Sequence, residues 1–127
     1  MSLARWLVLI ASIVLFAAGL LHVIGYLYGL GPALVKSGID PRVLGAVKCV
    51  WFVFTVELVI LSPAFVWISW LPGMRLLLLF LALIPVIDAI LMYYFVGAFI
   101  GSNMVAAGSV LLVIGAWLLP AAETRLQ

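Results

Sequence analysis

The stretch that decides the fold is VWFVFTVELVIL, residues Val50–Leu61, an apolar run with one carboxylic acid, Glu57, near its centre. A second run, LLLLFLALIPVIDAILMYY over Leu76–Tyr94, encloses Asp88 in the same way. An ionisable side chain in the middle of a membrane helix costs about 2.5–3.5 kcal/mol on insertion scales. Groups this costly almost always face the protein interior, where they have a function. The sequence therefore predicts a membrane protein with a polar site inside it.

The overall composition excludes a water-soluble globular domain. Of the 127 residues, 69% are hydrophobic and 8% are charged, whereas soluble domains are about 45–50% apolar and about 25% charged. Mean hydropathy is +1.48. Six basic and four acidic residues give a net charge of +2, too sparse for the clustered basic face that binds nucleic acid. Cys49 is the single cysteine, which rules out an internal disulfide, and we expect it to be a small buried side chain.

Four segments are long and apolar enough to cross a bilayer, which takes about 20 apolar residues. They are residues 3–28, 43–70, 75–96 and 103–120. The stretches Gly29–Pro32, Ser37–Pro41 and Trp70–Gly73 carry the Gly and Pro residues that mark turns between them. Lipid admits only helices or closed barrels, and short loops favour antiparallel neighbours. We therefore predict an all-α integral membrane protein, an up-down-up-down bundle of four transmembrane helices in a single domain of residues 1–127.

This topology puts both termini on one side of the membrane, called side A, and the other surface is side B. Basic residues are balanced between the two sides, so the positive-inside rule gives no orientation. Side A has Arg5, Arg75 and Arg125, and side B has Lys36, Arg42 and Lys48. We expect a bacterial-type inner (cytoplasmic) membrane and favour cytoplasmic termini. The balance also fits a protein that inserts in both orientations.

Small and aromatic residues indicate how the helices pack and where the membrane surface lies. Small residues recur every seven positions at Ala4, Ala11, Ala18 and Gly25, and again at Gly101, Gly108 and Gly115. Such stripes let membrane helices approach closely. Tryptophans 6, 67 and 70 lie near side A, where they predict an interfacial aromatic belt.

Three ionisable side chains on three different helices form the candidate catalytic set: His22, Glu57 and Asp88. At about 1.5 Å per residue, both acids fall near the middle of their helices and His22 lies toward side B. Candidate ligand-binding residues on the same half are Tyr26, Trp51, Tyr93, Tyr94 and Asn103. We therefore expect a cavity that opens to side B. His22 alone could instead be a structural histidine, and the tyrosines could be interfacial anchors.

No metal site and no cofactor are predicted. One His and two acids could form a mixed nitrogen and oxygen site, but the sequence has no paired His and no E-x-x-H spacing. Serine-hydrolase, phosphate-loop and dinucleotide motifs are likewise absent from the sequence.

The first helix reads AAGLLH over Ala17–His22, and the second combines Gly45 with Glu57-Leu58. With four short helices, these features resemble the DoxX-like group of small membrane proteins. The Ile84–Ala89 stretch, IPVIDA, is similar to related four-helix families of unknown function. The resemblance implies a four-helix membrane fold and an association with quinol-linked respiratory and redox complexes. The chain lacks the arginine-rich first helix and the CxxC motif of some members.

Three functions fit these residues. The first is a protein that binds a lipophilic small molecule, with acid–base catalysis of an isomerisation, cyclisation or hydration if it is an enzyme. The second is an accessory subunit of a membrane complex. The third is a proton-coupled, small multidrug-type transporter that works as an antiparallel dimer, so a homo-oligomer is a possible state. The expected partners are the lipid bilayer and the lipophilic ligand, without nucleic acid.

Overall fold

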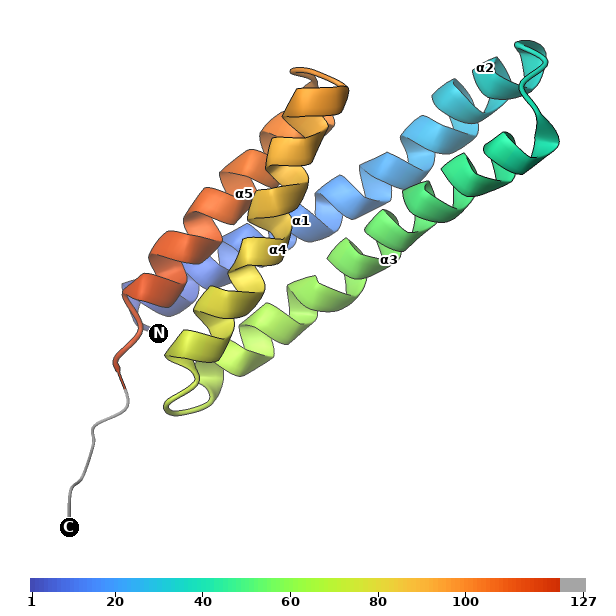
Figure 1. Ribbon diagram of the computed structural model, residues 1–127. Helices are drawn as coiled ribbons and strands as arrows, with labels where there is room; N and C mark the ends of the chain where they lie inside the picture. Colours follow the sequence, from blue (N-terminus) through green and yellow to red (C-terminus); the bar gives the residue numbers. More distant parts are fainter. Residues whose placement is uncertain (122–127) are drawn as a thin grey trace.

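The computed structural model describes residues 1–121, and these residues form helices joined by short turns (Figure 1). The elements are α1 (Leu3–Gly25), η1 (Tyr26–Leu30), α2 (Gly31–Lys36), α3 (Pro41–Trp70), α4 (Arg75–Phe95) and α5 (Ile100–Trp117). Four helical segments are long and apolar enough to cross a membrane, and α1, η1 and α2 together make the first of them. Arg125, one of the side-A residues, lies outside the described residues.

The first helical segment does not end near Tyr28 as expected but runs through Gly29–Pro32 to Lys36. It continues because η1 is a π-helical turn, in which Gly31 N–H donates to the carbonyl of Tyr26, five residues back. Pro32 follows at the start of α2, where a missing N–H does no harm. A side chain at Gly31 would clash, since its Cβ would lie 2.8 Å from Tyr26 O. The chain turns only after Lys36, where Gly38 adopts φ +69°.

The other helix boundaries follow from local hydrogen bonds. Asp40 caps α3, because its carboxylate accepts from the N–H groups of Arg42 at 2.8 Å and Val43 at 3.4 Å. Phe99 N–H donates to Ser102 Oγ at 2.9 Å, so α5 begins at Ile100, three residues before the expected start. Both α3 and α4 continue through an internal proline, Pro63 and Pro85 respectively.

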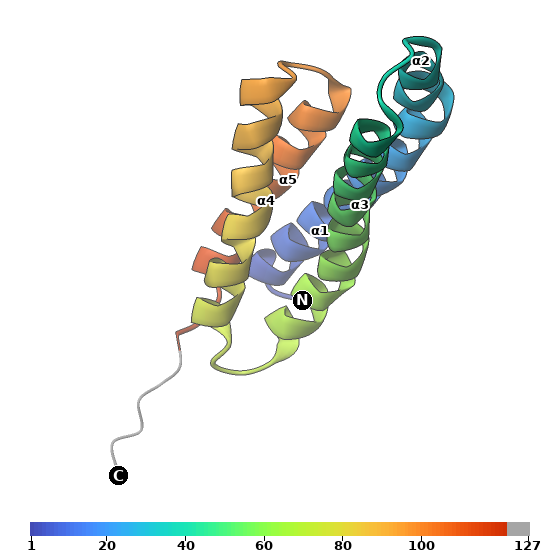
Figure 2. The ribbon, with the colours of Figure 1, turned by 45° about the vertical axis from the view of Figure 1, so that its right-hand side comes forward.

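The helices form two antiparallel pairs that diverge from the tight α3–α4 turn, as Figures 1 and 2 show. Helix α1 packs along both α3 and α5, and α4 packs along α5. Helices α3 and α4 are consecutive in the chain, yet they touch less than any of these pairs. The bundle is therefore closed on three sides and open along the α3–α4 side.

The tightest contact in the bundle joins α1 to α5 through small residues. A Cβ added to Gly115 would lie 2.9 Å from Val8 Cγ2 and 3.1 Å from Ala4 O, and one at Gly108 would lie 2.8 Å from Leu15 Cγ. Ala4, Ala11 and Ala18 are buried on the facing side of α1, whereas Gly25 at the end of this stripe is exposed. Close backbone approach of this kind gives dispersion contacts that lipid-facing helices otherwise lack.

We predict that Gly115→Ala destabilises the protein, by about 1–3 kcal/mol, as overpacking of a well-packed core typically does. The added methyl group would press on the backbone of α1 at Val8 N, 3.0 Å away. The matched control is Gly45→Ala in α3, where an added Cβ meets nothing within 4 Å. The measurement is denaturant-induced unfolding of the purified protein in detergent, followed by circular dichroism. Equal stability of the two variants would contradict the assignment of this contact.

Candidate functional site

The open side of the bundle contains a cavity of about 480 Å³ between α3 and α4, here called the acid groove. Its lining residues are His22, Cys49, Val50, Trp51, Val53, Phe54, Glu57, Asp88, Leu91, Met92, Phe95 and Val96. The groove therefore unites the three candidate catalytic residues, one each from α1, α3 and α4. Their chemical roles remain predictions.

Glu57 and Asp88 are level with each other because of the register of the α3–α4 hairpin. Glu57 lies about 20 Å from the end of α3 at Trp70, and Asp88 lies about 20 Å from the start of α4 at Arg75, at 1.5 Å per residue. Both side chains are half-buried. Two carboxyl groups that line one mostly apolar cavity repel each other when both are charged, which favours a protonated acid or a bound cation.

Asp88 has an unsatisfied oxygen. Its Oδ2 atom is buried and has no hydrogen-bond partner among the described residues. A buried polar atom without a partner carries a desolvation cost of about 1–3 kcal/mol, so such atoms in native proteins generally meet a ligand, an ion or water. Pro85 is buried in α4 one turn before Asp88, where it removes one backbone N–H from the helix.

Trp51 fixes His22 at the inner wall of the groove. The indole Nε1–H donates to the backbone carbonyl of His22 at 2.8 Å. The two rings also stack, with centroids 3.8 Å apart and planes inclined by 11°, while Phe54 packs against the imidazole at 4.7 Å. This arrangement joins α1 to α3 at the level of the groove and holds the imidazole in one orientation.

A second, smaller cavity of about 270 Å³ lies on the other side of this wall. His22, Trp51, Phe54 and Met92 line both spaces. The smaller cavity is bounded beyond them by residues of α1 and of the first turns of α5, such as Ala18, Gly25 and Gly101. The four shared side chains therefore form the partition between the two cavities.

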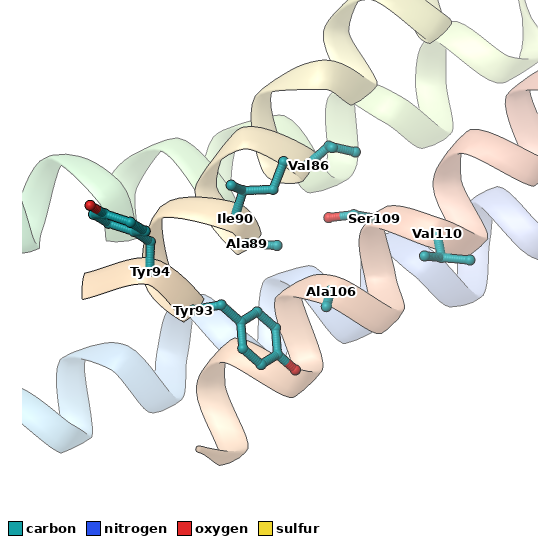
Figure 3. A pocket seen from close by; sticks show the side chains of 8 residues that line it. All are labelled: Val86, Ala89, Ile90, Tyr93, Tyr94, Ala106, Ser109 and Val110. Atoms are coloured by element: carbon teal, nitrogen blue, oxygen red, sulfur yellow. The ribbon is translucent and has the colours of Figure 1, made fainter. Parts of the chain in front are cut away.

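Two of the expected ligand-binding tyrosines lie elsewhere. Tyr93 and Tyr94 line a separate groove of about 520 Å³ between α4 and α5, together with small residues such as Ala89 and Ser109 (Figure 3). The Tyr93 hydroxyl donates to Asn103 Oδ1, a third member of the expected ligand-binding set. All three are exposed. The structure thus gives these residues a common position on the outer face of α4 and α5, away from the acid groove.

Tyr26, another expected ligand-binding residue, also lies outside the acid groove. Tyr26 is buried beside Phe52 and Trp51, and its hydroxyl has no hydrogen-bond partner among the described residues. It does not line the acid groove, whereas Trp51 does.

The expectation that Cys49 is buried is wrong, since this thiol is exposed and lines the groove. The reason is that α3 has no neighbouring helix on its open side.

Within residues 1–121, no three His, Cys, Asp or Glu side chains come close enough together to hold a metal ion. The three ionisable residues therefore share one cavity without forming a compact cluster. What they can do chemically is donate, accept or share protons at a ligand that lies between them.

The sequence analysis identified Trp51 as a ligand-binding residue, but it missed Phe54 and the lateral position of the opening. Trp51 and Phe54 are three residues apart and therefore share a face of α3, and Trp51 is six residues before Glu57. That spacing was a usable signal for the wall. The opening between α3 and α4 had no such signal, because it depends on which helices touch.

The chain matches no protein-family model, no curated protein and no solved structure with which it was compared.

We predict that cysteines introduced at the two acids are cross-linked across the groove. The variant Glu57→Cys/Asp88→Cys in a Cys49→Ala background should react with a short bifunctional maleimide to give an intramolecular link, because both positions line one cavity. The control replaces Glu57 by its neighbour, Val56→Cys/Asp88→Cys, since Val56 is exposed and does not line the acid groove. The readout is the mass of a peptide pair after digestion. Equal linking of both pairs would contradict the geometry.

Proposed function

We propose that this protein binds a lipophilic small molecule in the acid groove and acts on it, or carries it, through proton exchange at Glu57 and Asp88. The observation that supports this most strongly is the convergence of both acids and His22 on one cavity with otherwise mostly apolar walls. Its volume of about 480 Å³ falls within the range of about 300–1,000 Å³ that is usual for small-molecule sites.

The proposal includes insertion of the four helices in a bilayer as an up-down-up-down bundle with both termini on side A. Polar anchors at that end support it. The Arg5 guanidinium lies over the Trp70 ring at 4.5 Å, and that of Arg75 lies over the Trp117 ring at 4.6 Å. Arginine–tryptophan pairs of this kind belong at a membrane interface. A bacterial-type inner membrane with cytoplasmic termini is the proposed location.

Access to the groove would come from the lipid rather than from water on side B. The lining residues Val53, Leu91 and Phe95 are exposed, and in a bilayer an exposed face of α3 or α4 at this depth faces acyl chains. A lipophilic molecule dissolved in the membrane could therefore move sideways between the two helices. The expectation of a side-B opening is in this way refined to a lateral opening on the side-B half.

In the catalytic form of the proposal, one carboxylic acid donates a proton to the ligand and the other acid, or His22, accepts one. The three groups lie on three helices that the packing holds in fixed relation, which suits acid–base chemistry at a bound carbon or oxygen atom. Isomerisation or cyclisation of an isoprenoid-like or sterol-like compound requires no other group than these, whereas hydration also consumes one water molecule. The DoxX-like resemblance remains a prediction about ancestry and adds no residue to this scheme.

We predict that protein purified in a mild detergent carries a small lipophilic molecule, and that Val53→Trp displaces it by filling the groove. Ile60→Trp is the matched control, since Ile60 is 61% exposed on the same helix and does not line the acid groove. Native mass spectrometry of the three proteins reads out the bound mass. If all three retain it equally, the molecule is bound elsewhere.

The compound released from the groove provides the substrate for a second prediction. Glu57→Gln should lower its turnover by about 100-fold or more, the usual contribution of a general acid or base, because the amide keeps the size but exchanges no proton. The control is Asp40→Asn, which removes a surface carboxylate that caps α3 and replaces it with another good cap. A fully active Glu57→Gln protein would exclude the catalytic form of the proposal.

A further inference from the structure

The charged residues of the acid groove indicate one class of ligand. This inference about the ligand rests on the proposed function. Glu57 and Asp88 are the acids of its wall, and among the described side chains that line it none belongs to Lys or Arg. Asp88 Oδ2 is buried and receives no hydrogen bond from any described residue. A carboxylate shielded from water is stable only beside a cation or several hydrogen-bond donors. The described side chains of the wall supply neither, so a charged carboxylate at this place requires a ligand that does.

The aromatic residues of the wall favour a cation over a neutral donor. Trp51 and Phe54 both line the groove, and aromatic rings of this kind attract ammonium groups electrostatically. His22 is the only described side chain of the wall that could become positively charged, and Asp88 Oδ2 receives no hydrogen bond from it. Acids and aromatic rings together provide the two interactions by which proteins recognise alkylated ammonium groups.

The rim of the groove adds a requirement for an apolar tail. Val53 is 59% exposed, Leu91 is 47% exposed and Phe95 is 75% exposed. These side chains lie toward the open α3–α4 side, where a hydrocarbon tail would remain among lipid chains. A ligand with a charged head and an apolar tail therefore fits the whole surface, whereas a small hydrated cation would leave the rim without a contact.

We infer that the acid groove binds an amphiphilic cation, a molecule with an alkylated ammonium-type head and a hydrocarbon tail. The head lies beside Glu57 and Asp88 against the aromatic wall. The tail leaves the bundle sideways between α3 and α4, along Val53, Leu91 and Phe95. The acids release their protons as the head binds and then serve as its counter-ions, which corresponds to the form of the proposed function in which the protein carries the ligand.

Two matched photoreactive probes test this assignment with the full-length protein in lipid vesicles. Both carry the same alkyl chain with a benzophenone, and one ends in a trimethylammonium group while the other ends in a tert-butyl group. The two heads have nearly the same shape and differ in charge. Mass spectrometry of digested protein measures how much of each probe attaches to groove residues of α3 and α4. We expect the cationic probe to label the groove about tenfold more than the neutral one, or better, a preference equivalent to one favourable charge interaction.

The variants Asp88→Asn and Glu57→Gln separate charge from shape. Each variant should reduce labelling by the cationic probe about tenfold, because it loses one charge interaction. Each should leave labelling by the neutral probe unchanged. Unchanged neutral labelling also shows that the variant is still folded. Asp40→Asn removes a carboxylate at the exposed start of α3. This control should change labelling by neither the cationic nor the neutral probe.

Other results would overturn the assignment. Equal or stronger groove labelling by the neutral probe, or cationic labelling that survives both acid substitutions, excludes a cationic ligand but leaves the proposed lipophilic site in place. If neither probe labels the groove even after the co-purified molecule has been removed, the groove does not bind lipophilic molecules. That result excludes the proposed function as well.

Discussion

The fold depends first on the close approach of α1 and α5. In the proposed bilayer setting, lipid is as apolar as the side chains, so helices would gain little from burying hydrophobic area and would associate through packing instead. Gly108 and Gly115 leave room for Leu15 and Val8 at distances that no larger residue permits. This contact makes α1 the central helix, because its other face is free to pack along α3. The positions of all the other helices follow from it.

An open side is the direct consequence. With α3 on one flank of α1, and α4 held by α5 on the other, α3 and α4 are joined by a tight turn but diverge beyond it (Figure 2). A closed four-helix bundle would bury Glu57 and Asp88 against each other. Here the two acids lie at the same height on either side of a cavity. The same geometry that leaves Asp88 Oδ2 without a hydrogen-bond partner provides the space for a ligand that could supply one.

The aromatic wall is what makes this cavity a defined site rather than a gap. Trp51 contributes a hydrogen bond to His22 O and a ring face to the imidazole. One residue therefore links α1 to α3 at the level of the groove and sets the orientation of His22. Small movements of Trp51 and Phe54 would change both the acid groove and the smaller cavity behind it, so the wall couples the two spaces mechanically.

Hydropathy and the placement of single charged residues determined much of this protein without any tertiary information. Apolar runs of this length specified four helices long enough to cross a membrane, and the two acids inside them marked a polar interior. The small-residue stripes were likewise readable, although only Ala4, Ala11 and Ala18 of the first stripe are buried. Sequence patterns failed at the Gly29–Pro32 stretch, because a π-helical turn can carry a helix past a proline that usually ends it.

Only the tertiary structure decided which polar residues meet. The sequence places Tyr93, Tyr94 and Asn103 on the same half of the bundle as the groove residues, yet they lie on the outer face of α4 and α5. Periodicity fixes the face of a helix on which a residue lies, but it does not say which neighbour that face meets. The neighbour depends on contacts between residues far apart in the chain, here between α1 and α5. For that reason the sequence determined the helices and the kind of chemistry, while the packing determined the site.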